Sequence, residues 1–152
     1  MAAIKCYCDA SYDPKSHVAI IGYIVGNNSI CTEKIVNTNN TRAEIIGLIN
    51  LIGTLEDNDY VIYTDCQNII KRLKSKDKLV ENGFKNKKGI PLSNADLYKK
   101  LFDTIKPNIK LEHIKGHLPT KFMTDDNKMF SMLDKFVRKK LRNIVTNSNN
   151  DS

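Results

Sequence analysis

No hydrophobic run in the 152-residue sequence is long enough to cross a lipid bilayer, which argues against a membrane protein. The first residues, Met1 to Lys5, are not followed by the hydrophobic core of a signal peptide. We therefore expect a cytoplasmic protein, or one from a similar reducing compartment, with no membrane association.

Cysteine is scarce, and the four cysteines lack the paired spacing of a zinc site: Cys6, Cys8, Cys31 and Cys66. Cys6 and Cys8 lie on the same face of an expected strand, so we interpret them as small, reduced, buried residues. The sequence therefore favours neither a zinc site nor a fold held together by disulfides.

No internal repeat or linker divides the sequence, and its length suits one domain with its own hydrophobic core. Hydrophobic residues make up 41% and charged residues 27% of the chain, which is ordinary for a globular protein. We predict a single domain over residues 1–145, followed by a disordered polar tail over residues 146–152.

Acidic residues are outnumbered, since the chain has 24 Lys and Arg residues but only 17 Asp and Glu residues, which gives a formal net charge of +7. This excess favours a polyanionic partner, most simply nucleic acid. Lysines are densest between Lys71 and Lys88. Such a run is often only a solvated surface, and the alternative is that it contacts phosphates.

The hydrophobic pattern predicts nine elements in the order β-β-β-α-β-α-α-β-α. Strands are expected at residues 4–10, 18–25, 30–36, 60–64 and 109–115. Helices are expected at residues 42–55, 67–74, 96–105 and 125–145. The segment Gly26 to Asn28 is a hairpin signal, so the first three strands should form an antiparallel meander. The order predicts an α/β fold, with a mixed five-stranded sheet flanked by helices.

Four carboxylates lie at informative positions in these elements. Asp9 is near the end of the first strand, and Asp65 ends the fourth. Glu44 heads the hydrophobic face of the first long helix, and Asp134 lies at the buried edge of the last helix. Burial of a lone carboxylate is costly, and divalent cations would relieve the repulsion within a group of four.

Five short motifs carry these carboxylates and a histidine along the chain. They are Cys8-Asp-Ala-Ser11, Asn39-Asn-Thr-Arg-Ala-Glu44, Tyr63-Thr-Asp-Cys-Gln67, Ile114-Lys-Gly-His117 and Leu133-Asp-Lys-Phe-Val-Arg138. Each motif alone is weak, but in this order they make nearly the whole chain resemble type 1 ribonuclease H. The resemblance implies the ribonuclease H-like fold. It also implies an endonuclease that hydrolyses the RNA strand of an RNA–DNA hybrid by a two-metal-ion mechanism, using two Mg²⁺ ions or, alternatively, Mn²⁺.

The resemblance also implies roles for individual residues. His117 matches a histidine in a flexible loop that is associated with proton transfer or product departure. The implied metal ligands, which with His117 form the catalytic set, are Asp9, Glu44, Asp65 and Asp134.

Other residues match positions that contact the substrate, and the implied partner is the RNA–DNA hybrid itself. We expect a monomer with no small-molecule cofactor. The lysine-rich segment falls where some family members carry a basic protrusion, although here it is shorter and has no tryptophan. The implied substrate contacts are Ser11, Asn40, Gln67, Lys85, Lys87 and Lys88.

The interval between His117 and Asp134 is longer than in the best-known family members. The added residues, about 121–132, include Asp125 and Asp126, and either is an alternative fourth ligand. Both could instead stabilise the N-terminus of the last helix through its dipole. We favour Asp134, because it lies one turn after the hydrophobic Phe130 on the buried face.

Two other functions stay open at this point. One is a different nuclease on the same scaffold, such as a resolvase. The other is a non-catalytic module that binds hybrids; such a module would be expected to lose a carboxylate, and none of the four is missing.

Overall fold

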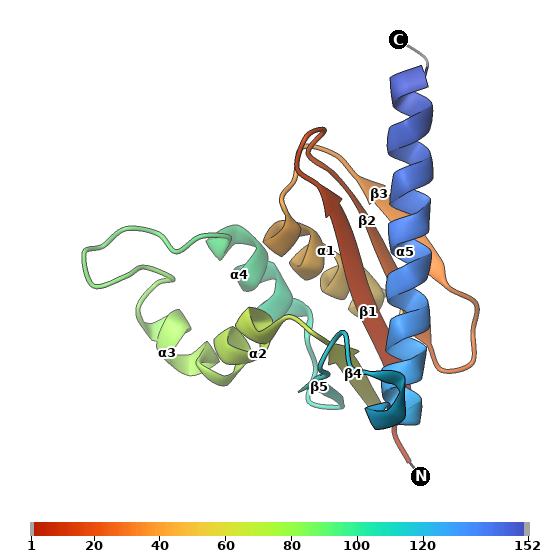
Figure 1. Ribbon diagram of the computed structural model, residues 1–152. Coiled ribbons are helices and arrows are strands. Elements are labelled where there is room, and N and C mark those ends of the chain that lie inside the picture. The colour runs from red at the N-terminus through yellow and green to blue at the C-terminus, as the bar shows by residue number, and fades with distance from the viewer. Residues whose placement is uncertain (1, 151–152) are drawn as a thin grey trace.

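The computed structural model describes residues 2–150 and arranges their five strands in one mixed sheet (Figure 1). The strands are β1 (Ile4–Asp13), β2 (Val18–Val25), β3 (Cys31–Ile35), β4 (Tyr60–Thr64) and β5 (Ile109–His113). Their order across the sheet is β3-β2-β1-β4-β5. The first three strands pair antiparallel, and β4 runs parallel to both β1 and β5. The predicted α/β class with a mixed five-stranded sheet is confirmed.

Helices cover both faces of this sheet. They are α1 (Asn40–Gly53), α2 (Gln67–Lys74), α3 (Lys76–Glu81), α4 (Ala95–Thr104) and α5 (Asp125–Asn150), with a short 3₁₀ turn, η1 (Thr120–Phe122). Helix α1 lies against one face and the long helix α5 against the other (Figure 1). Within residues 2–150, no helix combines the length and the hydrophobicity that crossing a membrane requires.

Each face of the sheet has its own hydrophobic core, because successive strand residues point to opposite sides. On the α1 side, Cys6, Cys8 and Ile62 pack against Leu48 and Leu51 of the helix. The two cysteines are buried, as predicted, and all four cysteines, which lie in the described part of the chain, have free thiols.

The second core, on the α5 side, is built from strands β1 and β2 and one face of the helix. Ile20 and Ile24 of β2 pack there against Leu133 and Val137 of α5.

Two glycines let the helices approach the sheet closely. A Cβ on Gly22 of β2 would collide with Val137 and would lie 3.0 Å from Leu133 Cδ1, both on α5. A Cβ on Gly47 of α1 would lie 3.3 Å from the Cβ of Ile21. The two glycines therefore set how near α1 and α5 lie to the strands.

Several element boundaries differ from those predicted. Strand β1 continues to Asp13, where we expected it to end at residue 10, because residues 11–13 remain paired with β2. Strand β5 ends at His113 rather than at residue 115. Helix α1 begins two residues early, since the side chain of Asn39 caps it by accepting a hydrogen bond from the Arg42 backbone at 2.9 Å.

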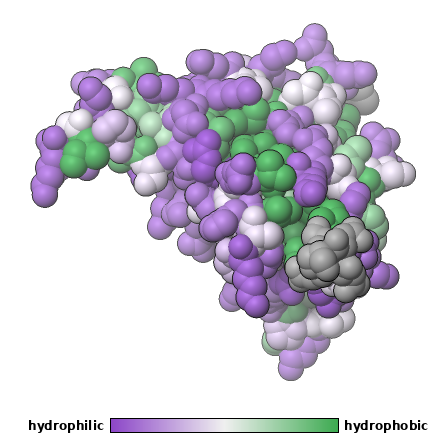
Figure 2. Space-filling model, turned by 90° about the horizontal axis from the view of Figure 1, so that it is seen from above, coloured by the Kyte–Doolittle hydropathy of each residue, from purple (hydrophilic) through white to green (hydrophobic). Residues whose placement is uncertain are grey.

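The short helix α3 was not predicted from the sequence. Its six residues are too few to give a clear helical period, and lysines occupy much of its surface. Helix α3 and the loop that follows it form a projecting segment, residues 76–94, which extends away from the sheet (Figure 1). Seen from above, this projection has both hydrophilic and hydrophobic residues on its surface (Figure 2). Buried Leu79 and Phe84 attach it to the core.

Helix α5 is longer than predicted, since it continues to Asn150 instead of ending at Val145. Residues 146–150 are therefore helical where we expected a disordered tail, and residues 151–152 lie outside the described residues. The sequence from Thr146 to Asn150 contains neither proline nor glycine, so it has no strong signal to end the helix.

Candidate active site

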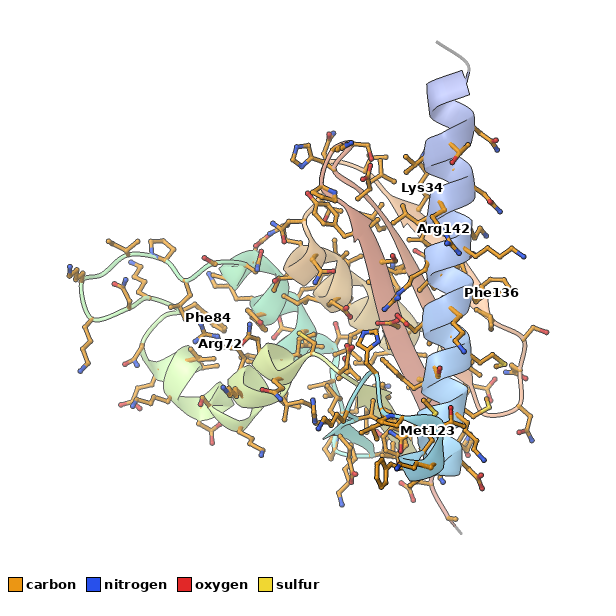
Figure 3. All side chains as sticks on the ribbon, viewed as in Figure 1. Lys34, Arg72, Phe84, Met123, Phe136 and Arg142 are labelled. Carbon is orange, nitrogen blue, oxygen red and sulfur yellow. The ribbon has the colours of Figure 1, made fainter. Side chains whose placement is uncertain are left out.

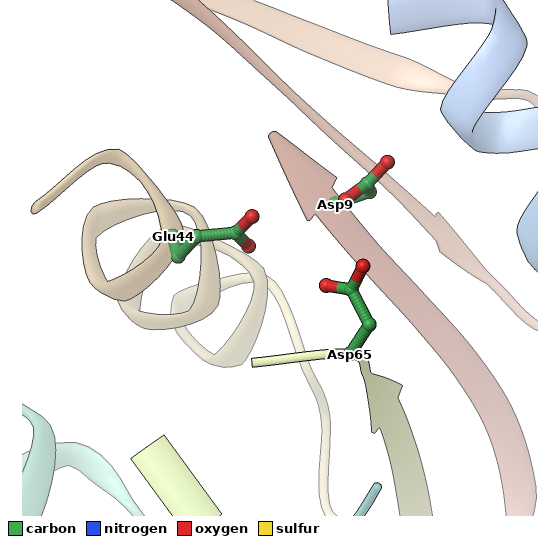
Figure 4. Close-up of side chains that lie close together, drawn as sticks. All are labelled: Asp9, Glu44 and Asp65. Atoms are coloured by element: carbon green, nitrogen blue, oxygen red, sulfur yellow. The ribbon is translucent and has the colours of Figure 1, made fainter. Parts of the chain in front are cut away.

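Three carboxylates from separate elements meet beside the sheet (Figure 4). Asp9 lies on β1, Glu44 on α1 and Asp65 directly after β4. One oxygen from each carboxylate lies within 4.8 Å of the other two. Strands β1 and β4 are parallel neighbours, and Tyr7 lies opposite Tyr63. Asp9 and Asp65 each follow two residues later, so both reach the same edge of the sheet.

Glu44 reaches this edge because α1 is fixed on either side of it. Asn39 caps the start of the helix, and Gly47, three residues after Glu44, packs against the sheet. The helix therefore holds the Glu44 side chain toward β1, where only 7% of the residue is exposed. Asp9 is 3% exposed.

The electrostatics of the cluster disfavour three negative charges. Burial, the charge of Glu44 and contact with Asp134 raise the pKa of Asp9. Burial, followed by the charges of Asp65 and Asp134, raises the pKa of Glu44 well above its ordinary value. Burial and the charge of Asp134 also raise the pKa of Asp65, against a smaller opposing effect of His113 and His117.

The cluster suits a divalent cation. Asp9 Oδ2 and Glu44 Oε2 are buried and have no hydrogen-bond partner among the described residues. Buried polar atoms are normally satisfied, so two such oxygens side by side call for a positively charged partner. Mg²⁺ and Ca²⁺ bind oxygen ligands at about 2.0–2.6 Å, and the spacing of the three carboxylates fits an ion between them. Asp9, Glu44 and Asp65 could hold such an ion.

Asp134 faces the same place from helix α5. An open pocket of about 390 Å³ is lined by Asp134 together with Asp9, Glu44 and Asp65. Asp134 lies one turn after the buried Phe130 on this helix. Four acidic residues that are distant in the sequence therefore share one pocket.

The two alternative aspartates lie elsewhere. Asp126 accepts a hydrogen bond from the Tyr7 hydroxyl at 2.6 Å and pairs with Lys5 at 3.2 Å. Although burial opposes the change, these hydrogen bonds lower the pKa of Asp126. Asp125 and Asp126 both fall in the first turn of α5, and neither lines the carboxylate pocket. The longer interval after the histidine is taken up by η1 and the first turns of α5.

His117 is held at the rim of the pocket by Arg138. The Arg138 guanidinium donates to His117 Nε2 at 3.1 Å, and the same nitrogen lies 3.1 Å from Asp134 Oδ2. Because arginine carries only donors, Nε2 of His117 must be the unprotonated ring nitrogen in this arrangement. Gly116 permits the approach of the loop, since a Cβ there would lie 3.3 Å from Asp65 Oδ2.

Arg138 is the residue of this site whose contacts were not foreseen from the sequence. It lies four residues after Asp134, a spacing that places both side chains on one face of a helix. That spacing predicts the salt bridge to Asp134, but not the contact with a loop 21 residues earlier.

The expected substrate contacts divide into three groups. Ser11 and Asn40 line the carboxylate pocket. Gln67 is exposed at the start of α2 and does not line it. The three lysines are exposed on the projecting segment, in a turn closed by Asn86, whose side chain accepts from the backbones of residues 88 and 90. These lysines are Lys85, Lys87 and Lys88.

Solved structures share this fold. The chain is similar to the solution structure of the PFV RNase H domain, with 22% identity and a TM-score of 0.75, covering 90% of this chain and 92% of that one. It is also similar to the crystal structure of prototype foamy virus protease–reverse transcriptase, with 22% identity and a TM-score of 0.72 over 90% of this chain and 20% of that chain.

A third similar structure is the foamy viral protease–reverse transcriptase in complex with an RNA/DNA hybrid. Its identity is 19% and its TM-score 0.67, over 86% of this chain and 19% of that chain. The chain thus spans about a fifth of the length of these two protease–reverse transcriptases. At these identities, the similarity shows the fold alone.

Sequence comparison gives the family. No curated protein matches the chain. The RNase H family model matches residues 1–142, which is nearly the whole described chain. The chain therefore belongs to the RNase H family of nucleases.

Proposed function

We propose that this chain is a metal-dependent endoribonuclease that hydrolyses the RNA strand of RNA–DNA hybrids. One observation carries the proposal. In a fold of the RNase H family, buried oxygens of Asp9 and Glu44 converge with Asp65 and have no partner within the described residues. A stable fold tolerates such a cluster when cations occupy it.

Four side chains would hold the ions, which we propose to be two Mg²⁺ or Mn²⁺. Asp9, Glu44 and Asp65 provide the buried ligands, and Asp134 adds a half-buried one from α5. A pair of such ions, when bound, activates a water and stabilises the leaving oxygen of an in-line displacement at a phosphate.

His117 and Arg138 would place hydrogen-bond donors at the rim of this site. With Nε2 accepting from Arg138, a neutral His117 keeps its proton on Nδ1. The loop can present that N–H as a hydrogen-bond donor to the leaving oxygen of the cut strand, with the proton remaining on the ring. Arg138 also pairs with Asp134 at 3.1 Å, so it holds that carboxylate in place before an ion binds.

Substrate selection would come from the polar rim and the basic surface. Ser11 and Asn40 lie beside the carboxylates, where they can contact the strand that is cut, and Gln67 extends this surface at the start of α2. A 2′-hydroxyl is the group that separates RNA from DNA at such a site. A related foamy viral enzyme has been solved in complex with an RNA/DNA hybrid, which supports hybrid as the substrate.

A cleavage assay tests this proposal. Labelled RNA–DNA, RNA–RNA and DNA–DNA duplexes of one sequence are incubated with the chain in Mg²⁺, in Mn²⁺ and in chelator. We expect cuts in the RNA strand of the hybrid, and only when metal is present. Cleavage of DNA–DNA would indicate a different nuclease on this scaffold, and hybrid binding without cleavage would indicate a non-catalytic module.

A further inference from the structure

The middle of α5 carries a concentration of positive charge. Between Asp134 and the described end of the helix there are five basic residues and no acidic residue. They are Lys135, Arg138, Lys139, Lys140 and Arg142. We propose that three of them, Lys135, Arg138 and Arg142, form a binding track for the backbone phosphates of the nucleic acid. The inference rests on the proposed function and extends its substrate surface to α5, where the sequence motifs implied a metal ligand but no substrate contact.

A groove beside the carboxylates marks the position of this track. It encloses about 340 Å³ and is lined by Ser11, Leu141 and the three basic residues. Ser11 and Arg138 also line the carboxylate pocket, so the groove and the pocket are continuous. Arg142, at the far end of the groove, is exposed on α5 (Figure 3).

The helix dipole does not account for these cations. Favourable effects of positive charge are confined to about the last turn of a helix. Helix α5 ends at Asn150, and its last turn contains no basic residue. Arg142 lies eight positions before that end, and Lys135 lies fifteen before it.

Ion pairing within the protein does not account for them either. In the part of the chain that the structure describes, Arg138 pairs with Asp134, whereas Lys135 and Arg142 form no ion pair. Both are exposed and face a groove that leads to the acidic site. A polyanion is the partner whose charge complements such a surface.

The dimensions suit a strand of nucleic acid. From Asp134 to Arg142 the helix rises about 12 Å at 1.5 Å per residue. One strand of a duplex advances about 3.4 Å per nucleotide, so the track spans roughly three to four nucleotides. A strand cut at the carboxylates could therefore continue along α5 with successive phosphates near Lys135, Arg138 and Arg142.

The test is the salt dependence of hybrid binding by Lys135→Gln/Arg142→Gln. Affinity for a labelled RNA–DNA hybrid is measured by fluorescence anisotropy in chelator, which keeps the hybrid intact, over a series of salt concentrations. Removal of two phosphate-binding charges should make the slope of log K against log salt less negative by about 1.8. The corresponding decrease in affinity is about 10- to 100-fold at 0.1 M salt.

Lys140→Gln is the matched control. Lys140 lies on the same helix and carries the same charge, but its side chain contacts Thr32 of β3 and does not line the groove. This variant should keep the parental slope. As a second measurement in Mg²⁺, the double variant should show a raised KM for hybrid cleavage with little change in kcat, because the track binds substrate without touching the reacting phosphate.

The outcomes separate this inference from the proposed function. If the parent cuts hybrid but the double variant binds it with the parental slope and KM, the α5 track is refuted and the proposed function stands. The track is refuted equally if Lys140→Gln changes the slope as much as the double variant does. A parent that neither binds nor cuts hybrid overturns both.

Discussion

At the scale of single residues, the site is defined by carboxylate oxygens that have no hydrogen-bond partner within residues 2–150. A buried acceptor with no donor costs about 1–3 kcal/mol, and more when it is charged. Asp9 and Glu44 both carry such an oxygen. Burial and the charges of neighbouring carboxylates raise the pKa of each residue. In the metal-free protein these residues reduce stability, so their presence favours a role in binding rather than in folding.

Neutral replacements at these two positions should therefore stabilise the metal-free protein. For Asp9→Asn and for Glu44→Gln we expect a gain of about 1–3 kcal/mol in the free energy of unfolding in chelator. Each kcal/mol corresponds to about 2–4 °C in Tm for a chain of this size. Thermal unfolding in chelator measures the effect. Asp103→Asn, at an exposed position on α4, is the control and should change Tm little. Lower Tm in both site variants would contradict this account.

A pair of matched variants tests whether Asp134 or Asp126 is the fourth metal ligand. Asp134→Asn should lower Mg²⁺-dependent cleavage of hybrid by at least about 100-fold, because Asp134 shares the pocket with the other three carboxylates. Asp126→Asn should keep cleavage within a fewfold of the parent, since Asp126 contacts Lys5 and Tyr7 instead. Initial rates with labelled hybrid give both values. Full activity in the first variant, with loss in the second, would move the ligand to Asp126.

At the scale of elements, the close packing of α5 on β2 determines where Asp134 lies. Gly22→Ala would push a Cβ into Val137 and Leu133, and we expect a loss of about 1–3 kcal/mol through overpacking. Gly53→Ala is the control, because Gly53 ends α1 with no atom within 4 Å of the added Cβ, so stability should rise slightly. Denaturant unfolding of both variants tests this. Equal effects would show that the contact between α5 and β2 is not tight.

The projecting segment is the second element with a separate test. Lys85, Lys87 and Lys88 are exposed there, on a turn that Asn86 closes. We expect them to contact the phosphates of the bound hybrid. Replacing all three by Gln should make the salt slope of hybrid binding less negative, by up to about 0.9 for each phosphate that these lysines neutralise. Anisotropy titrations in chelator supply the slope, with Lys140→Gln again as the control. An unchanged slope would assign these lysines to a solvated surface.

At the scale of the whole molecule, the sheet and the positions of the acidic residues could be predicted well from the sequence. Strand ends and helix faces follow from local patterns, so Asp65 at the end of β4 and Glu44 on the buried face of α1 could be located in advance. Asn39, a residue type that favours the position before a helix, caps α1.

What could not be predicted depends on interactions between distant segments. Helix α3 is too short to show a period, and its one buried residue, Leu79, is fixed by packing against the core. The contact of Arg138 with His117 depends on where a loop with a positive φ at His117 returns to α5. Local patterns do not fix such a loop, which is why the contact of Arg138 with His117 was recognised only from the structure.

The charge of the whole molecule is arranged in two zones. A chain with a net charge of +7 surrounds a pocket that contains four carboxylates. Basic residues lie on both sides of that pocket, on the projecting segment and on α5. This arrangement suits an enzyme that binds a polyanion on its basic surface and metal ions in its acidic pocket.

The central claim is that the buried carboxylates bind divalent metal, and calorimetric titration of the nucleic-acid-free protein with Mg²⁺ and Mn²⁺ tests it most directly. We predict saturable binding by the parent and an affinity at least about tenfold lower for Glu44→Gln, which removes one ligand charge without removing its volume. Equal affinity in the two proteins, or no binding by the parent, would contradict the account.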